Sequence, residues 1–427
     1  MNKKTKVILL LAYNQDDDSD WVPSLGLGYL CSFINKNLEN VDISIEKDIN
    51  DISKEDDIDF VGISSSTQNI NIAKKYALQV KNKLNAITFL GGPHITALPE
   101  ALPDEFDLGI IGEGELVLLN LLKNIKRFDN FFKAVKKTNG LVYRNKEGKI
   151  AQTEAQSPIL NLDRIPFPAR EELFYKNPYT VHMMTSRGCP NNCTFCCSKA
   201  IWSTVRYFSV DYVIAEIEYI ISNYQPGVIN FFDDVFFKNK EWLNEFADKI
   251  KQKGIDKKVD FTCYLRADQT DTEILKLFKD IGMKFIFFGA ESGSKEILRR
   301  YKDKNASVEK NQKLLDLASK IGIGVGATFI KGFPTETEKD LDKTYNFIEK
   351  NLKEKKLDIW KIFYLSPFPG SQMWKVAREK DIVSPDMDFS KFQNPVEDLY
   401  MNEKMEKEKF LKITKQRENF LSSINNE

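Results

Sequence analysis

Short apolar runs alternate with segments of helical spacing, and this alternation limits the possible folds more than any other feature of the chain. The first part contains four apolar runs and two helical segments, at residues 7–12, 60–64, 87–90 and 108–111 and at residues 27–38 and 72–84. Glycines follow the third and fourth runs. Such alternation is typical of a doubly wound parallel sheet, in which ligands bind at the carboxyl ends of the strands. We therefore predict an N-terminal doubly wound, Rossmann-like α/β domain at residues 1–145, which a short strand at residues 140–144 ends.

The alternation resumes after a connector at residues 146–180, where Pro166 and Pro168 disfavour a helix or a central strand. Six candidate strands follow, at residues 181–185, 228–232, 260–264, 285–289, 324–330 and 361–365. Helical segments separate them, at residues 210–223, 241–253, 272–281, 308–321 and 338–352. Six βα units predict a partial (β/α)6 barrel of TIM type at residues 181–375, with function at the C-terminal ends of its strands. A short C-terminal helical tail at residues 376–427 completes the chain.

The cysteines are bunched just after the first predicted barrel strand. Four of the six lie within nine residues, the full set being Cys31, Cys189, Cys193, Cys196, Cys197 and Cys263. Bunching in a long chain that lacks a signal-peptide pattern favours metal binding over disulfides. Three thiolates on one tight loop can hold three irons of a cubane, whereas full cysteine ligation would need four. Cys189, Cys193 and Cys196 therefore predict an iron–sulfur cluster with one iron open to an external ligand.

Zinc is the alternative that must be weighed for the same cysteines. Structural zinc sites usually use two separated pairs of cysteine or histidine. The chain has only two histidines, His94 and His182, and no second pair of ligands near the cysteines. Cys197 could complete a four-thiolate site, but adjacent ligands are sterically awkward. The open iron–sulfur cluster is the favoured interpretation.

The spacing C-x3-C-x2-C, with Phe195 before the last cysteine, resembles the signature of radical S-adenosylmethionine (SAM) enzymes. The resemblance implies that the amino and carboxylate groups of SAM chelate the open iron of a [4Fe–4S] cluster. One-electron reduction then cleaves SAM to methionine and a 5′-deoxyadenosyl radical. Such cofactors supply the reactive chemistry, while the protein supplies geometry and electrostatics.

Later segments resemble the SAM-binding segments of the same family. The resemblance assigns SAM contacts to a set of residues after successive strands, namely Asp233 and Asp234 (ammonium), Glu291 and Ser292 (ribose) and Gly332 within residues 329–335 (adenine). Arg266 ends the third strand and either points to the SAM carboxylate or forms an interior ion pair, while Cys263 on the opposite face is expected to be core. One position departs from the family pattern. Asp303 stands where a basic residue is common, so the group that balances the SAM carboxylate stays open.

The first domain resembles the cobalamin-binding domain that precedes many radical SAM barrels. The matching motifs are Gly26-Leu27-Gly28, Gly62-Ile63-Ser64, Gly91-Gly92-Pro93-His94 and Gly112-Glu113-Gly114-Glu115. Ser64 and Thr67 would bond the nucleotide tail of cobalamin, and Glu113 is a further candidate contact. Gly91 and Gly92 would leave room for that tail, although both glycines could serve only to shape a turn.

The motif Asp-x-His-x-x-Gly, with which some cobalamin proteins ligate cobalt from below, is absent. The loop after the first strand, residues 14–22, contains no histidine. We therefore expect no histidine at the lower axial position, and we expect His94 to contact the tail region or the backbone.

The leading hypothesis is a cobalamin-dependent radical SAM methyltransferase that acts on an unactivated carbon of a small-molecule or peptide substrate. The first alternative is radical cyclisation or rearrangement with the same cofactors, and the second is a non-catalytic iron–sulfur protein. The resemblance also implies an electron donor such as flavodoxin or ferredoxin. No individual catalytic residue is assigned.

Composition bears mainly on partners and location. Lys+Arg and Asp+Glu are both 62, so the chain carries no overall electrostatic footprint for nucleic acid or an anionic membrane. No segment reaches the roughly 20 apolar residues that span a bilayer. The lysines before residues 7–13 mimic a secretory signal, but the run is short and no small-residue cleavage site follows. We expect a buried first strand and a cytoplasmic protein without nucleic-acid or membrane partners.

Overall fold

The computed structural model describes residues 4–13, 24–53, 57–128, 130–173 and 179–424. The chain divides into two compact units, each with its own core. The first comprises residues 1–176 and two segments that return to it, Cys197–Arg206 and Ser384–Gln393. The second comprises Asn177–Cys196, Tyr207–Val383 and Asn394–Glu427. The returning segments were not expected from the sequence, and the finer boundaries at residues 145, 180 and 375 stay predictions.

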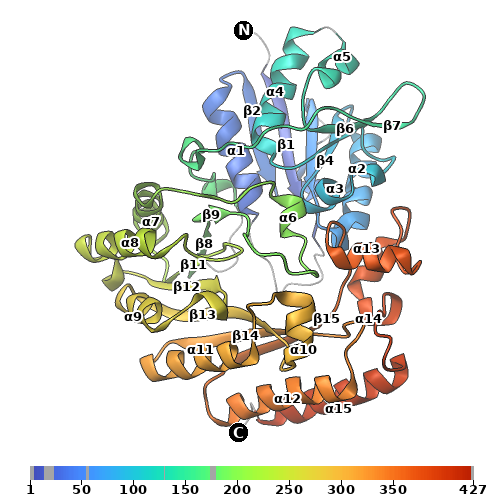
Figure 1. Ribbon diagram of the computed structural model, residues 1–427. Helices are drawn as coiled ribbons and strands as arrows, with labels where there is room; N and C mark the ends of the chain where they lie inside the picture. The colour runs from blue at the N-terminus through green and yellow to red at the C-terminus, as the bar shows by residue number, and fades with distance from the viewer. Residues whose placement is uncertain (1–3, 14–23, 54–56, 129, 174–178, 425–427) are drawn as a thin grey trace. The chain divides into compact units, whose positions relative to one another are not determined.

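The first unit is built on one sheet of seven strands in the order β2-β1-β3-β4-β5-β6-β7 (Figure 1). The pairs from β2 to β5 are parallel, whereas β6 and β7 run antiparallel. The bounds are β1 Thr5–Leu11, β2 Val41–Glu46, β3 Phe60–Ser64, β4 Ile87–Gly91, β5 Leu108–Ile110, β6 Leu141–Arg144 and β7 Ile150–Gln152. The predicted doubly wound domain is confirmed, and β2 and β7 are additions to it.

Helices cover this sheet, and the two returning segments pack within the same unit. The helices are α1 Leu25–Asn37, α2 Ile70–Lys83, α3 Pro93–Ala97, α4 Gly114–Arg127, α5 Phe131–Lys136 and α6 Ser198–Ile201. Helices α1 and α4 pack side by side. Helix α6 packs against α3, and the 3-10 turn Phe389–Gln393 packs against the 3-10 turn Thr67–Asn69. Chain from beyond residue 380 therefore contributes to the first unit.

The second unit is a six-stranded parallel sheet in the order β15-β14-β13-β12-β11-β8, and it confirms the predicted partial barrel. The bounds are β8 Thr180–Met183, β11 Val228–Phe231, β12 Asp260–Leu265, β13 Met283–Glu291, β14 Gly324–Lys331 and β15 Ile359–Tyr364. Along β12, Phe261, Cys263 and Leu265 are buried, whereas the residues between them keep some exposure. This alternation confirms that Cys263 belongs to the core behind the sheet.

Many helices of the second unit begin at a side chain that caps them, whereas α14 begins without one. The bounds are α7 Val210–Tyr224, α8 Lys240–Gln252, α9 Thr272–Asp280, α11 Val308–Ile321, α12 Glu338–Lys353, α13 Gln372–Glu379, α14 Pro395–Asp398 and α15 Lys407–Ile424. The side chains that accept a backbone N–H of the first turn are Ser209, Asn239, Asp271, Ser307, Thr337 and Ser371. Each cap satisfies a donor that a helix start leaves open. Within the described ranges, no helix combines the length and apolarity that crossing a membrane requires.

Candidate functional site

The cysteine loop begins where β9 (Ser186–Arg187) ends, at Gly188. Gly188 has a φ of +92°, a conformation that glycine adopts without steric cost. Cys189 and Cys193 are half-buried, Cys196 is exposed, and none of the three takes part in a disulfide. In the part of the chain that the structure describes, no three His, Cys, Asp or Glu side chains are already gathered as a metal site. The loop therefore carries three thiols on one short segment. That they bind one cluster is inferred from their spacing in the sequence.

Asp233 braces the strand that leads into this loop. Its carboxylate accepts four hydrogen bonds, from the backbone N–H and hydroxyl of Thr185 and from the backbone N–H and hydroxyl of Ser186, at 2.5 to 3.0 Å. Asp233 is buried, and burial raises its pKa to about 7 although these hydrogen bonds oppose the rise. The family resemblance assigned Asp233 to the SAM ammonium. In the structure, its carboxylate oxygens accept hydrogen bonds from Thr185 and Ser186 of the chain itself. Asp234, the next residue, is exposed.

The far end of the cysteine loop is held by the segment around Tyr301. The backbone N–H and the hydroxyl of Thr194 both donate to the carbonyl of Tyr301, each at 2.9 Å. The Tyr301 ring stacks on Phe333 with centroids 4.6 Å apart, and the Phe195 ring meets Phe333 edge-on at 6.0 Å. Phe195, the aromatic residue of the cysteine motif, thus fixes the loop by packing against the segment after β14.

Arg266 forms the interior ion pair that the sequence left as one of two alternatives. Its Nε and Nη2 donate to the two carboxylate oxygens of Asp268, at 2.9 and 2.8 Å. The remaining nitrogen, Nη1, lies 3.3 Å from the Sγ of Cys193. Burial raises the pKa of the Cys193 thiol, and the positive charges of Arg266 and Lys302 oppose this rise. Arg266 therefore places positive charge beside the Cys193 thiol, and such charge favours the thiolate form.

A buried lysine that the sequence analysis did not assign lies close to Glu291. The Lys302 Nζ donates to the carbonyl of Gly289 and lies 3.7 Å from a carboxylate oxygen of Glu291. Glu291 has a φ of +63°, which is uncommon for a residue with a side chain and is frequent at functional sites. Its carboxylate folds back over Gly289, where an added Cβ would lie 2.0 Å from Oε1. Burial raises the pKa of Glu291, and Lys302 and Arg266 oppose the rise.

A π-helical turn directly precedes Asp303, the position at which the family resemblance expects a basic residue. Leu298–Lys302 form a π-helix, which closes with a hydrogen bond from the N–H of Asp303 to the carbonyl of Leu298. Such a turn inserts one residue into the helical repeat and is frequent at functional sites. Lys302, the last residue of this turn, is buried, whereas Lys304 on the other side of Asp303 is exposed. In the sequence, this basic group was visible as Lys302, one position before Asp303.

Two further residues that the resemblance assigned to SAM have internal partners. Ser292 is buried, with its hydroxyl 3.0 Å from that of Thr344. Gly332 has a φ of +90°, and its N–H donates to a carboxylate oxygen of Glu336 at 2.6 Å. Through these contacts, both residues help to shape the turns at the strand ends.

In the first unit, the two adjacent glycines after β4 differ in their surroundings. A Cβ added to Gly91 would meet no heavy atom within 4 Å, so the space beside it is open. A Cβ added to Gly92 would lie 2.8 Å from the Oγ of Ser64 and 2.9 Å from the carbonyl oxygen of Ser65, and Gly92 has a φ of +94°. Gly92 is therefore required by the turn itself. Gly91 alone leaves room that a ligand could use.

Thr67 and His94 lie beneath one of the returning segments. Both are buried, with the Thr67 hydroxyl 3.2 Å from the Nδ1 of His94. The Phe389 ring meets the His94 ring edge-on at 4.7 Å, and burial lowers the pKa of His94 to about 4. His94 is therefore neutral, and its described neighbours are protein groups. The loop at residues 14–22, on which the expectation about cobalt ligation rested, lies outside the described residues.

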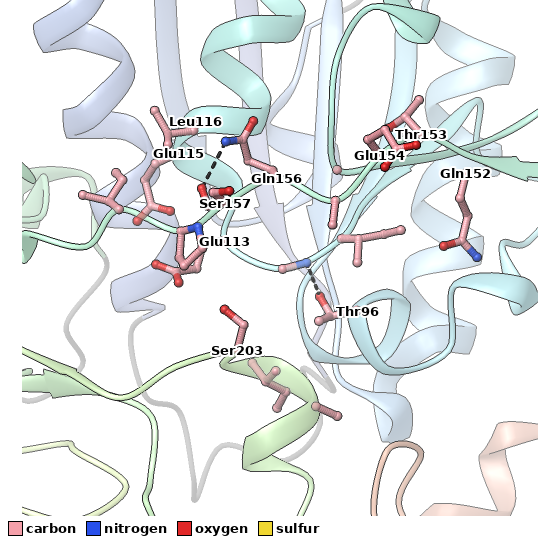
Figure 2. Close-up of a pocket in the computed structure, with 18 residues that line it drawn as sticks. Thr96, Glu113, Glu115, Leu116, Gln152, Thr153, Glu154, Gln156, Ser157 and Ser203 are labelled. Carbon is pink, nitrogen blue, oxygen red and sulfur yellow. Dashed lines mark hydrogen bonds between the residues drawn. The ribbon is translucent and has the colours of Figure 1, made fainter.

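Glu113 is tied to the other returning segment. Its two carboxylate oxygens accept from Nη1 and Nη2 of Arg206, and both side chains are largely buried. Glu113 lies on the wall of a cavity of about 390 Å³ between the loop after β5 and residues 152–159 (Figure 2). The first unit thus contains a recess at the carboxyl end of β5, and an ion pair helps to form its wall.

Family comparison identifies both units. The model of the radical SAM superfamily matches residues 183–348, and the model of the B12 binding domain matches residues 20–122. An uncharacterized methyltransferase of Pyrococcus horikoshii is 32% identical over 372 residues, which cover 83% of this chain and 78% of that protein. The chain belongs to the radical SAM superfamily. It is an enzyme of the group that carries a B12 binding domain, and its cofactors are a [4Fe–4S] cluster, SAM and cobalamin.

Two other similarities are informative. An anaerobic magnesium-protoporphyrin IX monomethyl ester cyclase of Rubrivivax gelatinosus is 27% identical, covering 87% of this chain and 69% of that protein. The structure of the radical SAM methyltransferase TsrM from Kitasatospora setae, with cobalamin and a [4Fe–4S] cluster bound, aligns with a TM-score of 0.71 at 14% identity. That alignment covers 88% of this chain and 75% of TsrM. At this identity the likeness concerns the fold.

Proposed function

We propose that this radical SAM enzyme is a cobalamin-dependent methyltransferase that acts on an unactivated carbon of a small molecule or peptide. The observation that carries the proposal is the pairing of a B12 binding domain with a cysteine loop of radical SAM spacing in one chain. The methyltransferase relative from Pyrococcus horikoshii and the fold of TsrM support this choice of reaction.

The residues fit the cofactors in their donor chemistry. Cys189, Cys193 and Cys196 would hold the cluster, and Arg266 keeps positive charge at 3.3 Å from the second thiol. The open space beside Gly91 would take part of cobalamin. When bound, the cluster supplies the electron that cleaves SAM and cobalamin carries the methyl group. The electron for the cluster would come from a small donor such as flavodoxin or ferredoxin in the cytoplasm.

Lys302 and Glu291 are the proposed SAM contacts that the structure supports best. Both are buried at the carboxyl end of β13, and both carry a charge that suits SAM. We assign the Lys302 ammonium to the SAM carboxylate and the Glu291 carboxylate to the ribose hydroxyls. Charge-assisted hydrogen bonds of this kind are stronger than neutral ones. Asp234, exposed on the turn after β11, stays the candidate for the SAM ammonium.

The test is anaerobic reconstitution with iron, sulfide and hydroxocobalamin, followed by assay of SAM for 5′-deoxyadenosine and S-adenosylhomocysteine. Both products support methyl transfer. The single variants Cys189→Ala, Cys193→Ala and Cys196→Ala should lose the cluster absorbance and both products. Cys197→Ala is the matched control and should retain them. An intact cluster in Cys193→Ala would refute the ligand assignment.

The second candidate is a cobalamin-dependent radical cyclase or rearrangement enzyme, which the 27% identical cyclase favours. The same assay separates the two functions. A cyclase would form 5′-deoxyadenosine without S-adenosylhomocysteine, because no methyl group leaves SAM.

A further inference from the structure

The C-terminal tail of the second unit packs on the turn that follows β14. Helix α15 lies beside α12 (Figure 1). Phe410 of α15 is buried, and a Cβ added to Gly332 of the turn would lie 3.5 Å from its ring. One residue before Gly332, the buried Lys331 pairs with Glu418 of α15. The carboxylate of Glu418 also accepts the hydroxyl of Tyr345 at 2.7 Å. The tail therefore holds the chain where β14 ends.

Asn402 binds the turn more directly, through its side-chain amide. Its Nδ2 donates to the carbonyl of Phe333 at 2.8 Å and to the carbonyl of Glu336 at 2.7 Å. Its Oδ1 accepts the backbone N–H of Lys404 at 2.8 Å and that of Met405 at 2.9 Å. The side chain is buried, and these four bonds use both amide hydrogens and both lone pairs of the oxygen. Only one orientation of the amide allows all four bonds, because exchanging its oxygen and nitrogen would place acceptor against acceptor.

The tail thus satisfies carbonyl groups of a buried turn. Residues 331–334 and Glu336 are buried. Besides the two carbonyls that Asn402 binds, the carbonyl of Pro334 accepts the backbone N–H of Glu403 at 2.9 Å. A buried carbonyl requires a partner, and leaving it without one is costly. Two adjacent residues of the tail therefore provide three donors to one turn.

The same turn contacts the cysteine loop. Phe333 stacks on Tyr301, and the Thr335 hydroxyl lies 3.0 Å from the hydroxyl of the same tyrosine. The carbonyl of Tyr301 accepts the backbone N–H and the hydroxyl of Thr194, which belongs to the cysteine loop. Phe195 of that loop meets Phe333 edge-on. A continuous set of contacts therefore joins the tail to the cysteine loop.

We infer that Asn402 is a positioning residue for the iron–sulfur cluster. It acts through the turn after β14, which places Tyr301 and, through it, the peptide between the second and third cysteines of the motif. A fully satisfied buried polar group fixes one arrangement of its neighbours, and contacts outside the ligand set orient the ligands of a metal site. This inference deepens the proposed function and rests on it, because it takes Cys189, Cys193 and Cys196 as the cluster ligands.

The experiment compares hydrogen exchange in the full, cluster-free chains of the parent, Asn402→Ala and Tyr400→Phe. Asn402→Ala removes both side-chain donors to the turn, so residues 189–196 should exchange at least about fivefold faster. Tyr400→Phe is the matched control, because it removes a hydrogen bond inside the tail, from the Tyr400 hydroxyl to the carbonyl of Met405, and it should leave this exchange unchanged.

A loss of global stability is separated from a loss of positioning by a second comparison. The parent is also measured at the urea concentration that lowers its free energy of unfolding to that of Asn402→Ala. At this matched stability, residues 189–196 of the parent should still exchange more slowly than those of the variant. A purely structural role of Asn402 would make the two rates equal.

Thr335→Val tests the next contact along the same path without changing the tail. It keeps the shape of the side chain and removes the hydroxyl that contacts Tyr301. Exchange of residues 189–196 should become about two- to threefold faster, because one hydrogen bond is lost. This variant remains informative if Asn402→Ala folds poorly.

Release of cluster iron gives a readout in the reconstituted enzyme. At equal iron content, Asn402→Ala should lose iron to the chelator bathophenanthroline about fivefold faster than the parent, because its ligand loop opens more often. Tyr400→Phe should release iron at the parental rate. Parental iron release from Asn402→Ala would overturn the inference.

Equal exchange of residues 189–196 in Asn402→Ala and the parent at matched stability would also overturn it. That measurement needs no cluster, so it does not depend on the proposed ligands. SAM products from the parent, with unchanged exchange in Asn402→Ala, refute the positioning role and leave the proposed function standing. An intact cluster in Cys193→Ala, with faster exchange in Asn402→Ala, refutes the proposed ligands alone.

Discussion

Replacing Asp233 tests whether this carboxylate braces the cysteine loop or binds SAM. Asp233→Ala removes the acceptor for the backbone N–H groups of Thr185 and Ser186, both of which are buried. Asp233→Asn keeps one carbonyl oxygen in place. That oxygen can still accept the two N–H groups, because both now donate to the same atom, Oδ1. The pair of variants therefore separates the loss of the acceptor from the loss of the charge.

The expected magnitudes follow from the four hydrogen bonds. A buried donor left without a partner costs about 1–3 kcal/mol, so two N–H groups imply a loss of roughly 2–6 kcal/mol in Asp233→Ala. Relief from burying a carboxylate offsets part of this loss. We expect Asp233→Ala to lower the free energy of unfolding by about 3 kcal/mol. Asp233→Asn should lower it by about 1 kcal/mol, because the geometry survives and only charge assistance is lost.

The assay is equilibrium urea unfolding of the cluster-free protein, with hydrogen exchange of residues 179–196 as the local readout. Asp233→Ala should exchange faster in this segment and should load less cluster. Asp233→Asn, at equal cluster content, should bind SAM as the parent does. An unchanged urea midpoint in Asp233→Ala would refute the bracing role. Loss of SAM affinity in a stable Asp233→Asn protein would return Asp233 to the SAM site.

Three further predictions concern other groups of the two units. Lys302→Met should weaken SAM binding roughly ten- to a hundredfold at equal cluster content, because a charge-assisted hydrogen bond contributes about this much. Calorimetry that shows the affinity of the parent would exclude Lys302 from the site. Gly91→Val should abolish retention of cobalamin on a desalting column and leave the urea midpoint unchanged, and a Gly91→Val protein that retains cobalamin would contradict this. Gly92→Ala should lower the urea midpoint, because its Cβ meets Ser64. Burial raises the pKa of Glu336 from 4.5 to about 8, so the folded state keeps a proton that the unfolded chain loses, and stability should fall as pH rises between these values. Glu336→Gln should remove this fall, and parallel pH profiles of the urea midpoint in variant and parent would show that Glu336 does not cause it.

Apolar runs flanked by turn residues predicted the central strands well. Strand β3 begins and ends where the sequence pattern placed it, and all six barrel strands were found within a few residues. Strand β3 is buried on both faces along most of its length, so it gives a continuous apolar run. Strand β2 was missed because it lies at an edge of the sheet, where Val41, Ile43 and Ile45 alternate with less buried residues. The returning segments leave no local signal, because their partners lie far away in the sequence, 93 residues for Arg206 and Glu113 and 325 residues for Gln393 and Gln68.

The sequence names the residue types of the candidate site, but it does not show which contacts each side chain makes. The adjacent acids Asp233 and Asp234 look equivalent in the sequence, yet one is buried among donors and the other is exposed. The direction of a side chain decides this difference, and a run of two acids carries no information about direction. Lys302 was not singled out because Lys302 and Lys304 flank Asp303 and look equivalent in the sequence, although only Lys302 is buried. Gly92 was predicted to leave room for cobalamin, and this stays a prediction; the structure adds that Ser64 lies close to it and that its φ is +94°.

The Ser384–Gln393 segment affects how this protein can be made and divided. Its Phe389 covers His94, so the first unit is built from both ends of the chain. On the ribosome, that cover becomes available only after residue 393 has been synthesised, long after the strands of the first sheet have emerged. A fragment cut at residue 176 would leave His94 open to water and would lack Arg206, the partner of Glu113. An N-terminal fragment is therefore an incomplete cobalamin module, and its failure to bind the vitamin would say nothing about the intact enzyme.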